Sequence, residues 1–237
     1  MFSHRDCSVR TLLDLSRFLI PWIAIVALSA QGDGNWFRQD FEGSQVGAEF
    51  DPLENLILEG TFVISEEKAG KVLAVSQGST GEFGFMFGPA LTSGSLQVDY
   101  FAESGSRRLQ PRFGIRACGM RGPALFYDAN TEELTLECDG QVTTRSLSIE
   151  WRQNWLRFKL ELGPGAIQGK VWPRDKEEPK AWSIRRNISP SESIFRGRSA
   201  VYGLLLGDAK IWIDNLRLDA STSVSPIKAK PTLEASR

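Results

Sequence analysis

Hydrophobic and polar residues alternate along much of the chain with a period of two. In residues 96–100, Leu, Val and Tyr alternate with Gln and Asp, and in 156–162 Leu and Phe alternate with Arg, Lys and Glu. The same alternation recurs in 112–117, 134–137 and 147–151. Successive side chains of a β-strand point to opposite faces, so each run predicts a strand with one face on a core and the other in water. Further apolar runs occur at 61–65, 71–76, 82–87, 166–172, 200–206 and 210–218.

Short turn signals separate these runs, and none of the runs has a convincing helical period. Asp139-Gly140, between two alternating runs, is the sharpest hairpin signal, because this pair suits a two-residue turn with positive φ. Many short strands without helices predict an all-β chain. We expect a two-sheet antiparallel sandwich, since each strand has one polar face and no internal repeat indicates a propeller.

The two ends of the chain differ from this pattern. Residues 1–30 carry three arginines, then an apolar run from Phe18 that ends in small residues, and this is typical of a secretory signal peptide. The run is shorter than the roughly 20 residues that span a bilayer. An uncleaved anchor and a buried N-terminal helix are the alternatives. We expect the folded domain in 31–219, a disordered polar tail in 220–237, and a secreted, periplasmic or cell-surface protein without a membrane span after signal removal.

Several segments occur in a familiar order. They are Phe41-Glu42-Gly43, residues 94–100, residues 114–116, residues 155–162, Lys170-Val-Trp-Pro173, Glu178-Pro179, Trp182 and residues 213–218. Together they resemble the concanavalin A-like lectin/glucanase (laminin G-like) jelly-roll domains of exported bacterial proteins, over roughly residues 36–218. The resemblance implies two curved antiparallel sheets. Such folds host lectins, carbohydrate-binding modules, glycoside hydrolases and adhesion domains, so the fold alone does not define the function.

Composition excludes several kinds of chemistry. The single histidine, His4, lies in the predicted signal, so the mature chain has no imidazole for Ser-His-Asp or Cys-His catalysis or for a His-ligated zinc site. A formal charge of −1 gives no basic field for nucleic acid or an anionic membrane.

Glycoside hydrolysis remains possible because it needs only two carboxylates. Glucanases that resemble this fold carry Glu-x-Asp-x-x-Glu on one strand. The nearest segment here, Glu132-Glu133-Leu134-Thr-Leu-Glu137, has leucine in place of the middle acid. We interpret it as a solvated edge, and the sequence favours a protein that is not an enzyme.

Sugar binding without catalysis needs exposed aromatic planes beside polar side chains. Trp155 and Trp172 share the polar faces of their strands. With Arg112 and Arg116 they could form one ligand-binding platform if their strands are neighbours; the alternative is that both tryptophans only cover the core. We therefore predict a non-catalytic carbohydrate-binding module. A glycoside hydrolase with an unidentified carboxylate pair and an adhesion domain with a protein partner are the alternatives.

The resemblance also suggests a structural calcium ion between the first and last strands. Asp40, Glu42 and Asp214 would supply the oxygen ligands. The alternative at Asp214-Asn215 is a β-bulge without metal, which would turn Trp212 outward.

Two cysteines remain after signal removal, Cys118 and Cys138. An even number in an exported chain permits one disulfide, and two buried thiols are the alternative.

Overall fold

The computed structural model describes residues 36–50, 55–67, 70–76, 81–106, 108–189 and 195–220. The predicted signal (1–30) and nearly all of the predicted tail lie outside these residues. No helix occurs in the described part, so none there is long and apolar enough to cross a bilayer. The strands are β1 (Trp36–Gln39), β2 (Leu56–Glu59), β3 (Thr61–Glu67), β4 (Gly70–Ser76), β5 (Glu82–Leu91), β6 (Gly94–Glu103), β7 (Arg112–Arg116), β8 (Ala124–Asp128), β9 (Glu133–Cys138), β10 (Gln141–Ser146), β11 (Trp155–Gly163), β12 (Ala166–Pro173), β13 (Ile184–Asn187), β14 (Gly197–Leu204) and β15 (Lys210–Ala220).

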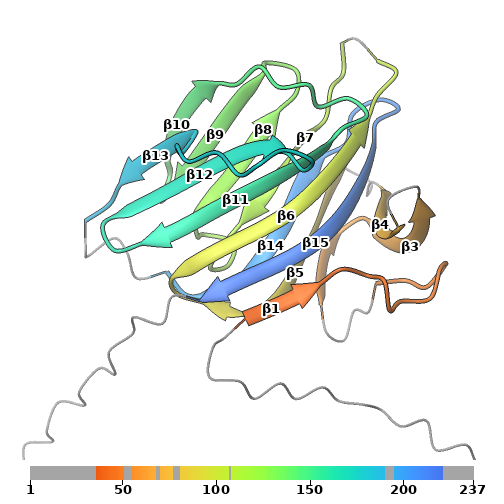
Figure 1. Cartoon of the computed structure of the whole chain (residues 1–237), viewed down its shortest axis with the longest axis horizontal. Coiled ribbons are helices and arrows are strands. Elements are labelled where there is room, and N and C mark those ends of the chain that lie inside the picture. Colours follow the sequence, from red (N-terminus) through yellow and green to blue (C-terminus); the bar gives the residue numbers. More distant parts are fainter. Residues whose placement is uncertain are drawn as a thin grey trace, which may run out of the picture. The chain divides into compact units, whose positions relative to one another are not determined.

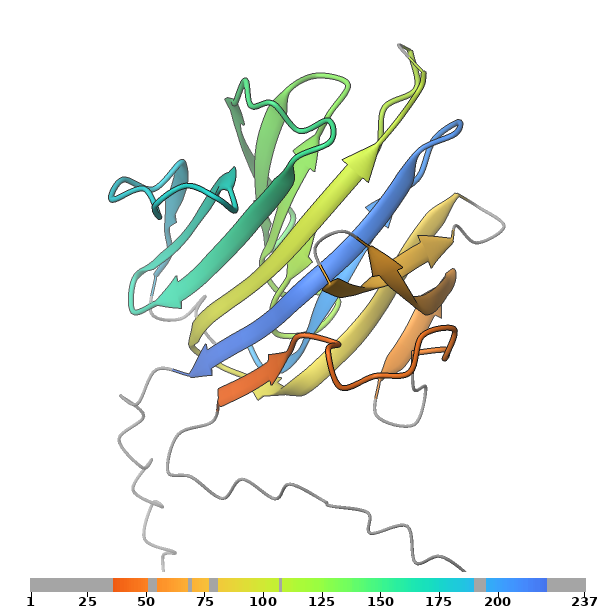
Figure 2. The same ribbon diagram turned by 45° about the vertical axis from the view of Figure 1, so that its right-hand side comes forward.

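The strands form two antiparallel sheets that pack face to face (Figures 1 and 2). The first sheet has the order β13-β12-β11-β6-β15-β4-β3, with β1 also paired to β15. The second sheet has the order β10-β9-β8-β7-β14-β5-β2. The predicted all-β, two-sheet sandwich is therefore confirmed.

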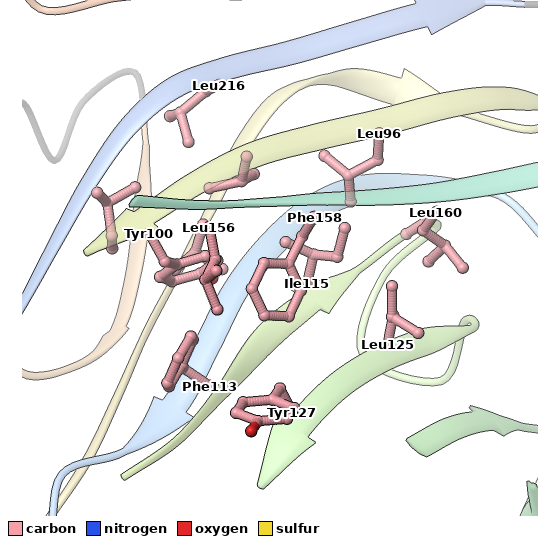
Figure 3. Close-up of a cluster of buried hydrophobic side chains, with 14 of the residues drawn as sticks. Leu96, Tyr100, Phe113, Ile115, Leu125, Tyr127, Leu156, Phe158, Leu160 and Leu216 are labelled. Carbon is pink, nitrogen blue, oxygen red and sulfur yellow. The ribbon is translucent and has the colours of Figure 1, made fainter. Parts of the chain in front are cut away.

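The core fills the space between the two sheets (Figure 3). Its centre is an aromatic cluster in which the rings of Tyr100, Phe113 and Phe158 lie 5.1 to 5.6 Å apart between centroids. Tyr100 belongs to the first sheet, and its hydroxyl donates a hydrogen bond to the carbonyl of Gly114 in the second. Burial raises the pKa of Tyr100 well above its ordinary value, so the hydroxyl stays protonated as a donor.

Strand β15 contains the predicted bulge. Its register against β6 shifts between Asp214 and Arg217, and Asn215 has a φ of 51°. The extra residue changes which parity faces inward, so Ile213 and Leu216 are both buried, while Trp212 lies on the outer face. The hairpin at Asp139-Gly140 is also confirmed: both residues have positive φ and join β9 to β10.

Residues 147–151 are not the strand that their alternation predicts. Trp151 is buried, and Leu147 and Ile149 pack against the core, but the segment lies between β10 and β11 without forming a ladder. The alternation correctly predicts that Leu147, Ile149 and Trp151 face the core. A strand also needs a partner strand, and residues 147–151 pair with none.

The two cysteines are buried thiols rather than a disulfide. Cys138 ends β9, and Cys118 follows β7, with β8 paired between these strands. Strands two places apart in a sheet are separated by about 10 Å, whereas a disulfide needs Cα atoms within about 7 Å. The Cys118 thiol lies 3.0 Å from the carbonyl oxygen of Leu91.

Candidate functional site

The four residues expected to bind sugar lie on two different sheets. Trp155 and Trp172 are on the outer face of the first sheet, on neighbouring strands β11 and β12. Arg112 and Arg116 are on β7 in the second sheet, where they point away from the core. Strand β7 is not a neighbour of β11 or β12 within a sheet, so the structure does not form the single platform that would unite all four residues.

Trp172 is covered by the segment 174–183, which we call the strap. The strap follows β12 and crosses the outer face of the first sheet (Figure 1). Its Glu178 carboxylate lies 2.7 Å from the Lys170 ammonium, and Lys170 also donates a hydrogen bond of 2.7 Å to the carbonyl of Pro179. The ammonium lies 4.4 Å from the ring centroid of Trp182. Trp172 is only 3% exposed beside these contacts, so almost none of its surface is open to a ligand in this arrangement.

Trp155 is half-buried in a row of aromatic rings that crosses three strands. Its ring lies 5.5 Å from that of Phe101 on β6, which lies 5.5 Å from that of Trp212 on β15. We call these three residues the aromatic row. The Arg174 guanidinium stacks 4.3 Å from the Trp155 centroid, so a cation from the strap already covers that ring.

A buried ionic cluster lies beside the aromatic row. Asp99 on β6 and Asp214 on β15 are opposite each other in register and are 0% and 6% exposed. Arg157 binds Asp99 through two nitrogens at 2.6 and 2.7 Å, and Arg174 binds Asp214 at 2.9 Å. Burial raises the pKa of Asp214 to about 6, against the opposing effects of a backbone hydrogen bond from Asn215 and the charge of Arg174.

The candidate calcium ligands do not form a cluster in the described residues. Asp214 is occupied by Arg174, whereas the Glu42 carboxylate accepts the Lys71 N–H at 3.3 Å, and Asp40 accepts the Glu42 N–H. The described part of the chain holds no group of three or more side chains with the geometry of a metal site. Calcium binding by Asp40, Glu42 and Asp214 therefore stays a prediction.

The outer face of the second sheet has a floor of aromatic rings placed over glycines. Phe126 on β8 lies opposite Gly114 on β7, where an added Cβ would be 2.8 Å from a ring atom. Tyr202 on β14 lies opposite Gly84 on β5, where an added Cβ would be 3.1 Å from a ring atom. The two rings meet edge to face at 5.9 Å. Because glycine has no side chain, each ring can lie close to the sheet.

The two predicted arginines both lie over the Phe126 ring, at 4.7 Å for Arg112 and 5.7 Å for Arg116. They differ in what their N–H groups bind. Arg116 donates to the carbonyl of Gly122 at 2.9 Å and pairs with Glu137 at 3.3 Å, and only 13% of its side chain is exposed. Arg112 is exposed, and no ion pair joins it to a carboxylate of the described residues.

Acidic residues complete this face. The Tyr202 hydroxyl is hydrogen-bonded to Glu82, and burial together with this carboxylate raises the pKa of Tyr202. Asp128 lies opposite Arg112 in register, and Glu133 lies opposite Asp128 on β9. We call Arg112, Phe126 and Tyr202, with Glu82 and Asp128, the arginine–tyrosine face. On this face the donor Arg112 and the acceptors Glu82 and Asp128 lie beside the rings of Phe126 and Tyr202.

The sequence matches no protein-family model and no curated protein. Solved structures do share its fold. A Crh5 transglycosylase has a TM-score of 0.55 at 8% identity, covering 79% of this chain and 85% of its own. Lectin II from Ulex europaeus has a TM-score of 0.51 at 7% identity over 78% and 97% of the two chains. A β-1,3-glucanase from Mycobacterium marinum has a TM-score of 0.51 at 9% identity over 77% and 97%.

These similarities establish the fold as a concanavalin A-like lectin/glucanase jelly roll, as the sequence motifs predict. The same fold carries a lectin, a glucanase and a transglycosylase, so the choice between binding and catalysis depends on the side chains of this chain.

Proposed function

We propose that this chain is an exported, non-catalytic carbohydrate-binding module whose ligand lies on the arginine–tyrosine face. The observation that carries the proposal is that the Arg112 side chain is exposed and forms no ion pair with a described residue. Its guanidinium is exposed and oriented by stacking on Phe126, and no carboxylate of the described residues pairs with it. A preoriented arginine with unused N–H groups is suited to hydrogen-bond sugar hydroxyls.

The neighbours of Arg112 supply the other requirements of a sugar site. The apolar face of a pyranose can lie on the Tyr202 ring, and the carboxylates of Glu82 and Asp128 can accept hydrogen bonds from hydroxyls. This mixture of one cation and several acids favours an uncharged glycan over an acidic one. Arg116, bound to Glu137, acts as a positioning residue for Phe126.

A non-catalytic role is supported by the place of the carboxyl pair on the first sheet. Retaining and inverting glycosidases need one carboxyl with a raised pKa and a second about 5–9 Å away, both in contact with substrate. Asp214 has the raised pKa and faces Asp99, but both are buried and bound by arginines. A glycoside cannot reach them unless Arg157 and Arg174 are displaced.

The test is affinity electrophoresis of the full chain through gels that contain laminarin, hydroxyethylcellulose or galactomannan. We expect retardation by at least one of these neutral polysaccharides. Arg112→Ala and Tyr202→Ala should each weaken binding by about tenfold or more, since each removes one or two hydrogen bonds or a stacking plane. Arg185→Ala is the matched control, because Arg185 is an exposed arginine of the first sheet.

Three results would contradict the proposal. Unchanged retardation of both variants would exclude this face, and no retardation in any gel would favour the adhesion alternative. Release of reducing ends by the wild type, lost in Glu82→Gln or Asp128→Asn, would identify a hydrolase instead.

A further inference from the structure

A polar cleft lies at one end of the sandwich, away from the arginine–tyrosine face. It has a volume of about 630 Å³, and its lining comes from the end of β6, the start of β15 and the segment before β11. The lining residues include Glu103, Glu150, Arg152, Gln153 and Lys210. The volume is in the range of small-ligand sites, which is about 300–1,000 Å³.

The cleft continues directly into the aromatic row. Phe101 and Glu103 are two residues apart on the outer face of β6, and Trp212 and Lys210 are two residues apart on β15. Glu103 lies opposite Lys210 in register, just as Phe101 lies opposite Trp212. Figure 2 shows these ends of β6 and β15 side by side. Aromatic rings and polar groups therefore meet on one continuous surface.

Some polar groups of the cleft are already committed to the fold. Asp208 accepts hydrogen bonds from the N–H groups of Gly105 and Ser106, each at 3.2 Å, and so shapes one wall. The Arg152 guanidinium stacks 4.4 Å from the centroid of Trp151. These contacts hold the loops that form the cleft.

Other groups of the cleft remain available for a ligand. Glu103, Glu150 and Lys210 form no ion pair with any described residue. In the aromatic row, Arg174 covers Trp155, whereas no cation of the described residues stacks on Trp212. Two acceptors, one ammonium donor and a partly exposed indole together match the hydroxyls and apolar face of a neutral sugar.

We propose that the cleft and the aromatic row form a second carbohydrate site, which makes the module bivalent. The ligand class rests on the proposed function. A sugar residue stacks on Trp212, and its hydroxyls bind Glu103, Glu150 and Lys210. The two sites belong to the outer faces of opposite sheets, so one module can hold two glycan chains and gain avidity on a polysaccharide surface.

Isothermal titration of the full chain with laminaripentaose, cellopentaose and mannopentaose tests this arrangement. We expect two sites per chain for a bound pentasaccharide. Glu103→Gln combined with Glu150→Gln preserves side-chain volume and should reduce the number of sites per chain to one. Trp212→Ala should also reduce the number of sites to one. The matched control is Glu66→Gln with Glu177→Gln, two exposed acids outside the cleft.

The variants also separate this inference from the proposed function. Wild-type stoichiometry of one, lost in Arg112→Ala and unaffected by the cleft variants, would overturn the second site and leave the first. Binding that is lost in the cleft variants but unaffected by Arg112→Ala would support the cleft and overturn the proposed face. A heat signal absent with every pentasaccharide would count against both.

Discussion

At the scale of single residues, the arginines differ by what already binds them. Arg157 and Arg174 neutralise the buried carboxylates of Asp99 and Asp214. A buried carboxylate costs several kcal/mol without a partner, so these arginines are required by the fold. Arg112 has no such ion pair among the described residues and is exposed. The alternating pattern places Arg112 and Arg157 on outer faces, and Arg174 lies in the strap outside any alternating run, so the sequence does not show which arginine is already bound.

Asp214 gives the residue-scale prediction. Its folded-state pKa is about 6, above its ordinary value of 3.8, so between these values the folded protein holds a proton that the unfolded chain has released. The contribution of this group to stability is therefore fully present below about pH 4 and is lost as the pH rises through 6. Asp214→Asn cannot titrate.

The free energy of unfolding, measured in urea from pH 4 to 7.5, checks this prediction. The wild type should gain stability relative to Asp214→Asn as the pH falls. Parallel curves for the two proteins across this range would contradict the assignment.

At the scale of strands, the close packing of β7 and β8 depends on Gly114. A Cβ there would lie 2.1 Å from the carbonyl oxygen of Leu125 and 2.8 Å from the Phe126 ring. We expect Gly114→Ala to reduce the free energy of unfolding by about 2–3 kcal/mol, because backbone and ring must both move. Gly43→Ala is the control, since its Cβ would meet no atom within 4 Å. Equal urea midpoints for the two variants would contradict the claim that the packing of β7 against β8 needs glycine at position 114.

The same strands show how far the sequence predicts the site. Alternation correctly predicts β6, β7, β9 and β11, because in each strand apolar residues that face the core alternate with mostly polar residues on the outer face. It misses β8, whose residues Ala124–Tyr127 are buried on both faces. The outer face of β8 is covered by side chains of the neighbouring strand, with two arginines over Phe126, so no polar positions interrupt the apolar run. Phe126, on which Arg112 stacks, is thus on β8, the strand whose sequence does not alternate.

The burial of Trp172 could not be predicted from the sequence, for a related reason. Trp172 has the parity of an exposed residue but is 3% exposed, on the strand whose Lys170 binds the strap. The contacts of Glu178 and Pro179 with Lys170 that fix the strap over β12 join residues eight and nine positions apart through a loop. Strand periodicity describes which face a side chain is on, but not what a following loop places over that face.

At the scale of the whole molecule, the sandwich uses only its inner faces for the core. Stability comes from a continuous cluster of aromatic and aliphatic side chains between the two sheets. Both outer faces are then available to carry ligand sites, which is the geometric basis for a bivalent module. A core of this extent does not need a covalent link between strands.

The thiols of Cys118 and Cys138 should therefore remain unlinked. The Cys118 thiol is 5% exposed, and burial raises its pKa to about 12, so little reactive thiolate exists at pH 8. Iodoacetamide should label Cys118 and Cys138 slowly in the folded chain and rapidly in urea without prior reduction, as read from tryptic peptides by mass spectrometry. The unfolding temperature should be the same with and without dithiothreitol. Labelling in urea that required prior reduction would show a disulfide, and the two strands would then have to approach by several ångströms, to within about 7 Å between Cα atoms.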